Sequence, residues 1–153
     1  MTISHLGNLE QAETILYLPA PPILPTGDTL NLPELIKING NHWRKILTIY
    51  AKLCCTKGRW QDYRDQKLLH NVDAISFANQ LIDNQNPRCS HIVAGKASWA
   101  RLGIEPSQLD DIDAEGMAKS CAYKKGQLIL TPYPDYRQFP NALIEQVKHV
   151  LQG

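Results

Sequence analysis

The sequence predicts a three-layer α/β/α sandwich with a short, mostly parallel central sheet. Short apolar stretches alternate with amphipathic segments along the chain, and the stretch "HIVAGKASW" runs through one glycine into a helix, as βα junctions of parallel sheets do. The chain has 153 residues, 43% hydrophobic and 20% charged, which is ordinary for a soluble globular domain. No repeat or long linker divides it, so we expect one α/β domain over residues 1–153.

The first strand is expected at Thr14–Leu18, because the prolines of "PAPPILP" that follow cannot donate to a sheet ladder. Residues 32–38 fit either one helical turn or a short strand, since periodicity does not decide between them. Apolar residues at spacings of three and four, from Trp43 to Cys54, predict a helix in the stretch "NGNHWRKILTIYAKLCC", with Asn41 as its cap and an end near Gly58.

The polar stretch "KGRWQDYRDQK", residues 57–67, is interpreted as a solvated connection anchored by Trp60 and Tyr63. The alternative is a nucleic-acid-contacting loop in which these aromatic rings stack on bases. Residues 71–87 are predicted to form a second amphipathic helix, capped by Asn71 and ended at Pro87. Its apolar stripe would consist of Val72, Ile75, Ala78 and Ile82.

A second strand is expected at His91–Ala94, followed by a turn at Gly95 and a helix over residues 96–102 that Gly103 closes. The stretches "CAY" and "QLILT" on either side of "KKG" predict a hairpin whose last strand is continuously apolar and therefore central. Residues 141–152 form the last predicted helix.

In open α/β sheets, ligands bind beyond the carboxyl ends of the parallel strands. Three loops leave such ends, near positions 20, 96 and 135, and we expect them to meet along one edge. The third loop, "TPYPDYRQFPN", holds three prolines that restrict its backbone. The alternative is a packed loop in which Arg137 merely pairs with Asp135. The predicted ligand-binding residues are Lys96, Ser98, Tyr133, Asp135, Tyr136, Arg137, Gln138 and Asn141.

The motifs that would indicate a cofactor or a metal are incomplete. "AGKAS" has Ser90 and Ala97 where a phosphate loop needs a glycine and a hydroxyl residue, although Lys96 beside helix amides could still meet an anion. "DIDAEG" starts like a calcium loop with Asp111, Asp113 and Glu115 before Gly116, but Ala122 stands at its twelfth position. Cys89 and His91 supply only two zinc ligands. We therefore expect no cofactor, no metal and no hydrolytic triad.

Charge and targeting signals favour a soluble cytoplasmic protein. Lysine plus arginine (16) nearly balances aspartate plus glutamate (15), so no global field draws the chain toward nucleic acid or membrane. The N-terminus lacks the features of a secretory signal, and prolines interrupt the most apolar early run, "ILYLPAPPIL". Four cysteines occur without a CxxC spacing, as in free thiols of a reducing compartment.

Three stretches, "HIVAGKASW", "LILTPYPDYRQFPN" and "ILYLPAPPILP", are similar in order and placement to the strand–loop segments of the uracil-DNA glycosylase superfamily. The resemblance implies a three-layer sandwich with its site at the strand ends. The late loop has Thr131-Pro132-Tyr133 in place of that family's His-Pro-Ser, and no carboxylate lies between Leu16 and Pro25, so base excision is not implied. The chain also resembles members of a small uncharacterised bacterial family with a "TPYPDYRQFPN"-type ending, which implies no activity.

These features favour a protein that binds a small anionic or nucleotide-like ligand at the carboxyl ends of its strands. The first alternative is a nucleic-acid enzyme or binder that uses the same edge plus Arg59, Trp60, Tyr63 and Arg64. The second is a non-catalytic protein whose loop edge is buried between copies. The residues name no reaction, and the sequence does not fix an oligomeric state.

Overall fold

The computed structural model describes residues 3–27, 30–112 and 122–152. In this part of the chain, seven strands form one sheet in the order β1-β3-β2-β4-β7-β6-β5. The strands are β1 His5–Gly7, β2 Thr14–Tyr17, β3 Asp73–Ser76, β4 Ser90–Ala94, β5 Asp110–Asp111, β6 Tyr123–Lys125 and β7 Leu128–Thr131.

The sheet is mixed, which corrects the expectation of a mostly parallel one. The four central strands β3, β2, β4 and β7 run parallel to one another. On one side β1 pairs with β3 in the antiparallel sense, and on the other side β6 pairs antiparallel to both β7 and β5. The direct turn between β6 and β7 forces their reversal, since parallel neighbours need a longer crossover.

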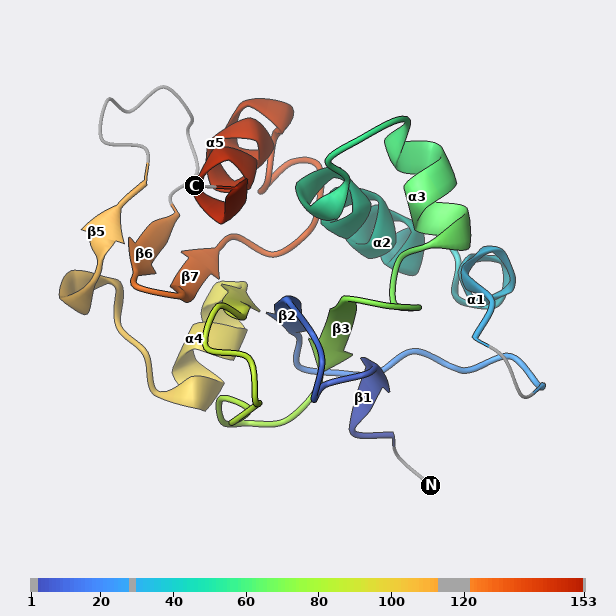
Figure 1. Ribbon diagram of the computed structural model, residues 1–153, viewed down its shortest axis with the longest axis horizontal. Helices are drawn as coiled ribbons and strands as arrows, with labels where there is room; N and C mark the ends of the chain where they lie inside the picture. The colour runs from blue at the N-terminus through green and yellow to red at the C-terminus, as the bar shows by residue number, and fades with distance from the viewer. Residues whose placement is uncertain (1–2, 28–29, 113–121, 153) are drawn as a thin grey trace.

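The described residues contain five α-helices and one short 3-10 helix, and the α-helices lie on both faces of the sheet. Figure 1 shows α1, α2, α3 and α5 on one face and α4 on the other. We call the larger group the helical layer. The helices are α1 Leu32–Asn39, α2 Asn41–Cys54, α3 Trp60–Gln66, α4 Lys96–Leu102 and α5 Asn141–Gln152, and the 3-10 helix is Pro106–Gln108. No helix in this part of the chain has the length and hydropathy needed to cross a membrane.

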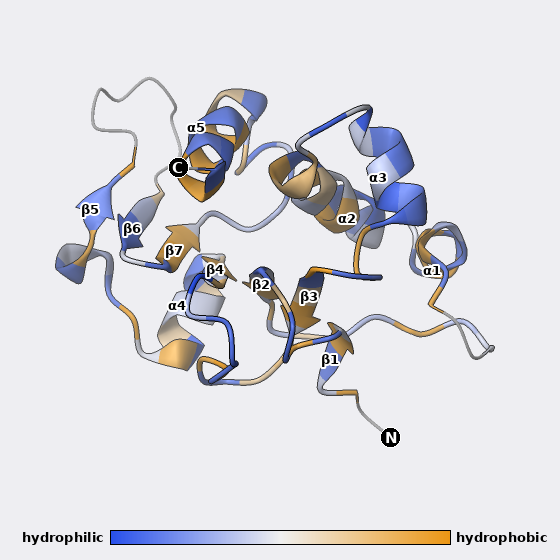
Figure 2. Cartoon of the chain, viewed as in Figure 1, coloured by the Kyte–Doolittle hydropathy of each residue, from blue (hydrophilic) through white to orange (hydrophobic). Residues whose placement is uncertain are grey.

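Alternation along the parallel strands divides the core in two. Leu16, Ile75, Ile92 and Ile129 face the helical layer and pack in the larger apolar cluster. Their neighbours in sequence turn to the other face, where Tyr17, Val93 and Leu130 pack with Trp99 of α4. Figure 2 agrees, because the apolar sides of α2 and α5 lie toward the sheet.

Several predicted elements are confirmed. The strand near residue 14, the strand–glycine–helix unit around Gly95, the hairpin and the last helix all occur, and Gly103 ends α4 in the left-handed conformation. The ambiguous residues 32–38 belong to helix α1, which Asn31 caps by accepting a hydrogen bond from the Glu34 amide. Helix α2 starts after Gly40, which is its N-cap in place of Asn41, and ends at Cys54.

The predicted helix over residues 71–87 is wrong. Residues Asp73–Ser76 form β3, whose four side chains are all buried, and the rest of the segment is a loop. A strand buried on both faces has no alternation to distinguish it from a buried helix. The loop is held by side chains: Asn84 donates to the carbonyl groups of Leu9 and Ala12.

Residues 57–67 are not an irregular connection, because Trp60–Gln66 form helix α3. This helix has no buried residue and no side-chain cap, so it lacks the apolar stripe by which the sequence could have indicated it.

In the incomplete calcium-loop motif, Asp111 belongs to β5. Asp113, Glu115 and Gly116 lie outside the described residues.

Candidate functional site

The carboxyl ends of β2, β4 and β7 lie along one edge of the sheet, because these strands are parallel neighbours. We call it the carboxyl edge. The Gly95 amide donates to the Thr131 carbonyl (2.8 Å), which joins the loops that follow β4 and β7. The Arg101 guanidinium donates to the carbonyls of Leu18 and Phe77, at the ends of β2 and β3. The expected gathering of the three loops at one edge is therefore confirmed.

The loop of residues 132–141 is held in place mainly by its own backbone. The Asp135 carbonyl accepts the amides of Gln138 and Phe139, and the Asp135 carboxylate accepts the Arg137 amide at 2.9 Å. Lys45 of α2 contacts the other carboxylate oxygen at 3.5 Å. The hydrogen bond from the Arg137 amide lowers the pKa of Asp135, and the charge of Lys45 lowers it further. Asp135 thus fixes the loop through the Arg137 backbone, and no ion pair between the two side chains appears.

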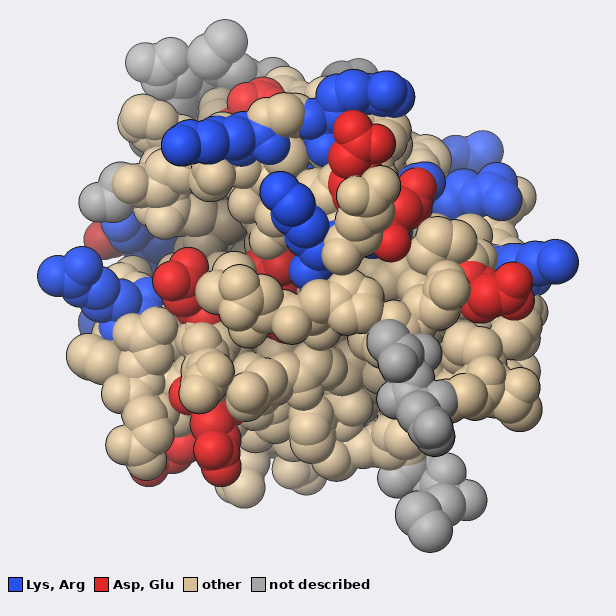
Figure 3. Space-filling view, turned by 45° about the vertical axis from the view of Figure 1, so that its right-hand side comes forward, with Lys and Arg blue, Asp and Glu red and all other residues tan. Residues whose placement is uncertain are grey.

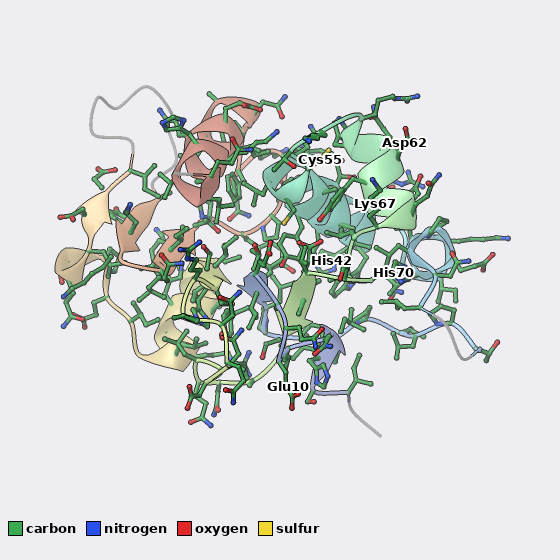
Figure 4. All side chains as sticks on the ribbon, viewed as in Figure 1. Glu10, His42, Cys55, Asp62, Lys67 and His70 are labelled. Carbon is green, nitrogen blue, oxygen red and sulfur yellow. The ribbon has the colours of Figure 1, made fainter. Side chains whose placement is uncertain are left out.

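Tyr133 faces into the protein. Its ring covers Gly95, where an added Cβ would lie 3.1 Å from the tyrosine ring, and Gly95 has a φ of +89° that also favours glycine. The ring stacks on His42 in the first turn of α2, labelled in Figure 4, and a 2.7 Å hydrogen bond joins the hydroxyl to His42 Nε2. Burial raises the pKa of Tyr133. Tyr133 therefore ties the loop to α2 and α4.

The outer side of the same loop borders a hollow of about 400 Å³ against α2, which we call the α2–loop hollow. Tyr136 is 47% exposed there. The Lys52 ammonium donates to Asn141 Oδ1 at 3.1 Å. Lys45 lies 5.8 Å from the centre of the Tyr136 ring. The lining residues are Lys52, Tyr136, Phe139, Pro140 and Asn141.

The predicted ligand-binding residues do not form one site. Tyr136 and Asn141 line the α2–loop hollow. The side chains of Arg137 and Gln138 are exposed on the same loop. Lys96 and Ser98 begin α4, which packs on the opposite face of the sheet from α2.

Ser98 is 1% exposed, and its hydroxyl has no hydrogen-bond partner among the described residues. Neither Ser98 nor Lys96 lines the α2–loop hollow. Sequence reasoning missed Lys45 and Lys52, because lysines on the outer face of an amphipathic helix look like solvated residues.

The surface around the α2–loop hollow is basic and aromatic. Lys52 lies 5.1 Å and Arg64 5.4 Å from the centre of the Trp60 ring, so α2 and α3 extend the positive surface beyond Tyr136. Figure 3 shows Lys and Arg side chains concentrated in the upper part of that view. Tyr63 does not join Trp60 on this surface, as the nucleic-acid alternative would require, because its hydroxyl donates to buried Asp73 at 2.6 Å and anchors the segment to the body of the protein.

The Cys89–His91 pair is part of the core on the α4 face. Cys89 is buried, and a 2.7 Å hydrogen bond joins His91 Nδ1 to the Tyr17 hydroxyl, which also accepts the Ile82 amide. Burial lowers the pKa of His91 and raises the pKa of Tyr17 to about 12. Within the described ranges, no group of three or more His, Cys, Asp or Glu side chains could hold a metal ion.

The lowered pKa of His91 predicts acid sensitivity. Below about pH 6.5 the unfolded chain takes up a proton at this imidazole, while the folded protein keeps it neutral until the lower folded pKa is reached. The free energy of unfolding should therefore fall as the pH drops below about 6.5. Urea denaturation at pH 7.5 and at pH 5.5 measures this fall. It should be smaller in His91→Gln, and an unchanged fall in that variant would show that another group is responsible.

The chain belongs to a family of unknown function, DUF6942, whose model matches residues 4–152. The expected membership of an uncharacterised family is thus confirmed. No curated protein and no solved structure matches the chain. The similarity to the uracil-DNA glycosylase superfamily accordingly gains no support from these comparisons.

Proposed function

We propose that the protein binds a small anionic ligand with a planar ring, of the nucleotide class, in the α2–loop hollow. The observation that carries this proposal is that Lys52, Asn141 and exposed Tyr136 line one space of about 400 Å³. Ligand pockets commonly hold about 300–1,000 Å³. The two lysines of α2 would meet phosphate, and the Tyr136 ring would stack on a base.

The position and order of the loop support the proposal. It follows β7 at the carboxyl edge, where ligands of α/β sheets bind, and α4 opposite the helical layer supports the three-layer arrangement in which this rule applies. Its internal hydrogen bonds and buried Phe139 hold Tyr136 and Asn141 in place before any ligand arrives. A site ordered in advance loses less conformational entropy on binding.

Thermal shift with AMP and UMP tests the proposal. A ligand at a hundred times its dissociation constant stabilises the folded protein by about 2.7 kcal/mol, which is readily measured. We expect both nucleotides to raise the Tm of the wild type and of the control variant Lys37→Ala, whose lysine lies on α1. Lys52→Ala and Tyr136→Ala should lose most of this rise. Equal shifts in all four proteins would place the ligand elsewhere, and no shift in any would reject the proposal.

A second candidate is single-stranded nucleic acid, favoured by the extension of the same basic surface to Trp60 and Arg64. A strand contacting Lys45, Lys52 and Arg64 through three phosphates would bind with a log–log salt slope of about −2. The same variants with a twelve-nucleotide oligomer, measured by fluorescence anisotropy at rising salt, separate the two candidates. A strand predicts Kd values that rise steeply with salt and a further loss in Trp60→Ala, whereas a single nucleotide in the hollow predicts neither.

A further inference from the structure

The parallel strands begin at the edge of the sheet opposite the carboxyl edge. There, a row of polar residues crosses the three neighbouring strands β3, β2 and β4. We call this edge the amino edge. Thr14 of β2 is in register with Asp73 of β3 and with Ser90 of β4. Two residues further along, the same strands place Leu16, Ile75 and Ile92 under the helical layer. Since residues two apart on a strand share a face, the polar row lies on the same side as this apolar row.

The polar row forms part of the wall of a hollow of about 420 Å³, which we call the amino-edge hollow. Around it stand the ends of α2 and α5, Tyr63 of α3 and the loop before β4. Its lining includes Glu13, Asp73, Arg88 and Ser90, together with Leu151 and Gln152 at the end of α5.

Asp73 is a buried acid without a counter-charge. The residue is 2% exposed, and its carboxylate accepts the Tyr63 hydroxyl. No lysine, arginine or histidine forms an ion pair with it in the described part of the chain. Burial raises the pKa of Asp73. Hydrogen bonds from the Tyr63 hydroxyl, the Cys54 thiol and the Leu69 amide oppose this rise, and the charge of nearby Glu13 adds to it. Buried charges are normally paired, so a cation from outside would relieve this cost.

The surroundings of Asp73 favour positive charge. Helices α2, of 14 residues, and α5, of 12, both end at the amino-edge hollow. The carboxyl end of a helix carries a partial negative charge. Glu13 is exposed and lines the hollow as well. Because the described residues include no metal-binding cluster, an organic ammonium group fits this end better than a metal ion.

A neighbouring hollow of about 510 Å³ has basic residues and, among the described residues, no acidic residue in its lining. It is lined by Arg88 and Lys124 and shares Arg88, Ser90, Leu151 and Gln152 with the amino-edge hollow, so the two adjoin. Arg88 forms no ion pair with the described residues. The amino edge thus has an acidic end at Asp73 and Glu13 and a basic end at Arg88 and Lys124. A ligand with a positive and a negative group matches both ends.

We propose that the amino edge binds a small zwitterion of the amino-acid or dipeptide class, with its ammonium group at Asp73 and Glu13 and its carboxylate at Arg88 and Lys124. Among the described residues, the amino-edge hollow and the α2–loop hollow share no lining residue, although Lys52 of the α2–loop hollow directly precedes Leu53 and Cys54 of the amino-edge hollow. The zwitterion proposal is therefore independent of the nucleotide proposal, and each can fail without the other.

Thermal shift with three matched pools of dipeptides tests the proposal: free dipeptides, the same peptides N-acetylated, and the same peptides amidated at the carboxyl end. The free pool should raise the Tm. Acetylation removes the positive charge, and amidation removes the negative charge. We expect the N-acetyl pool to give no shift and the amidated pool to give a smaller shift than the free pool.

The variants Glu13→Gln, Asp73→Asn and Arg88→Gln locate the site, with exposed Glu105→Gln as the matched control. Titration calorimetry with the tightest free dipeptide should show about tenfold weaker binding in each of the three, the loss of one charge pair, and unchanged binding in the control. Arg88→Gln should distinguish the free from the amidated form less than the wild type does, with Lys124 as the remaining positive group. Because Glu13 is exposed, its variant gives a result even where Asp73→Asn fails to fold. No shift from the free pool, or an equal shift from the N-acetyl pool, would overturn the proposal.

Discussion

Replacing Phe139 with alanine should lower the free energy of unfolding by about 3–5 kcal/mol, as truncation of buried aromatic residues does. Phe139 is 1% exposed and packs in the apolar cluster beneath the helical layer. It is also the point at which the 132–141 loop enters the core, between exposed Tyr136 and the start of α5. Its loss would leave a cavity and free the loop that borders the α2–loop hollow. Urea denaturation followed by circular dichroism measures the change.

The matched control is Tyr136→Ala in the same loop. Its ring is 47% exposed, so we expect a change of no more than about 0.5 kcal/mol, as for surface substitutions. The two variants together separate the anchor of the loop from the side chain that we assign to ligand binding. Equal destabilisation by both would contradict this division, and a loss below about 1 kcal/mol in Phe139→Ala would show that Phe139 does not anchor the loop.

Trp99→Ala should have an effect of similar size, about 3–5 kcal/mol, for a partly different reason. The indole Nε1 of Trp99 donates to the carbonyls of Val93, at 2.9 Å, and Thr131, at 3.1 Å. These carbonyls lie near the carboxyl ends of β4 and β7, so a single side chain of α4 is hydrogen-bonded to the ends of both strands. The ring also packs edge-on against Tyr123, with centroids 6.0 Å apart.

Trp99→Phe isolates the hydrogen bonds, because phenylalanine keeps an aromatic ring but has no donor. We expect a loss of about 1–3 kcal/mol, because the Val93 carbonyl loses its indole donor, whereas the Thr131 carbonyl keeps the Gly95 amide. The order of stability should be wild type, then Trp99→Phe, then Trp99→Ala, in the same urea experiment. If Trp99→Phe were as stable as the wild type, the two carbonyls would not depend on the indole.

The sequence predicted the elements that carry strong local signals. Helix α2 has a continuous apolar stripe, and the passage through Gly95 into α4 requires a backbone conformation that glycine supplies. The segment around β3 misled the prediction, because Val72, Ile75, Ala78 and Ile82 are spaced as in a helix. The true constraint there is tertiary: β3 is inserted between β1 and β2, where both of its faces are buried.

The meeting of the loops at one edge was predictable, but not which of their side chains face outward. Parallel strands have a common carboxyl edge, so the sequence correctly brought the loops near residues 96 and 135 together. Which side chains face outward depends on neighbours that only the fold supplies. Tyr133 turns inward because Gly95 and His42 accept its ring, whereas Tyr136 stays exposed beside Lys45. The amino edge was missed entirely, since Asp73 was assigned to a helix.

The central claim, a nucleotide site in the α2–loop hollow, is tested most directly by NMR. AMP would be titrated into ¹⁵N-labelled protein while the backbone amide signals are followed. We expect saturable shifts of the amide signals of Lys52, Tyr136 and Asn141, with the amide signals of Asp73 and Arg88 unmoved. Saturable shifts confined to other parts of the protein, or no shift at millimolar AMP, would contradict it.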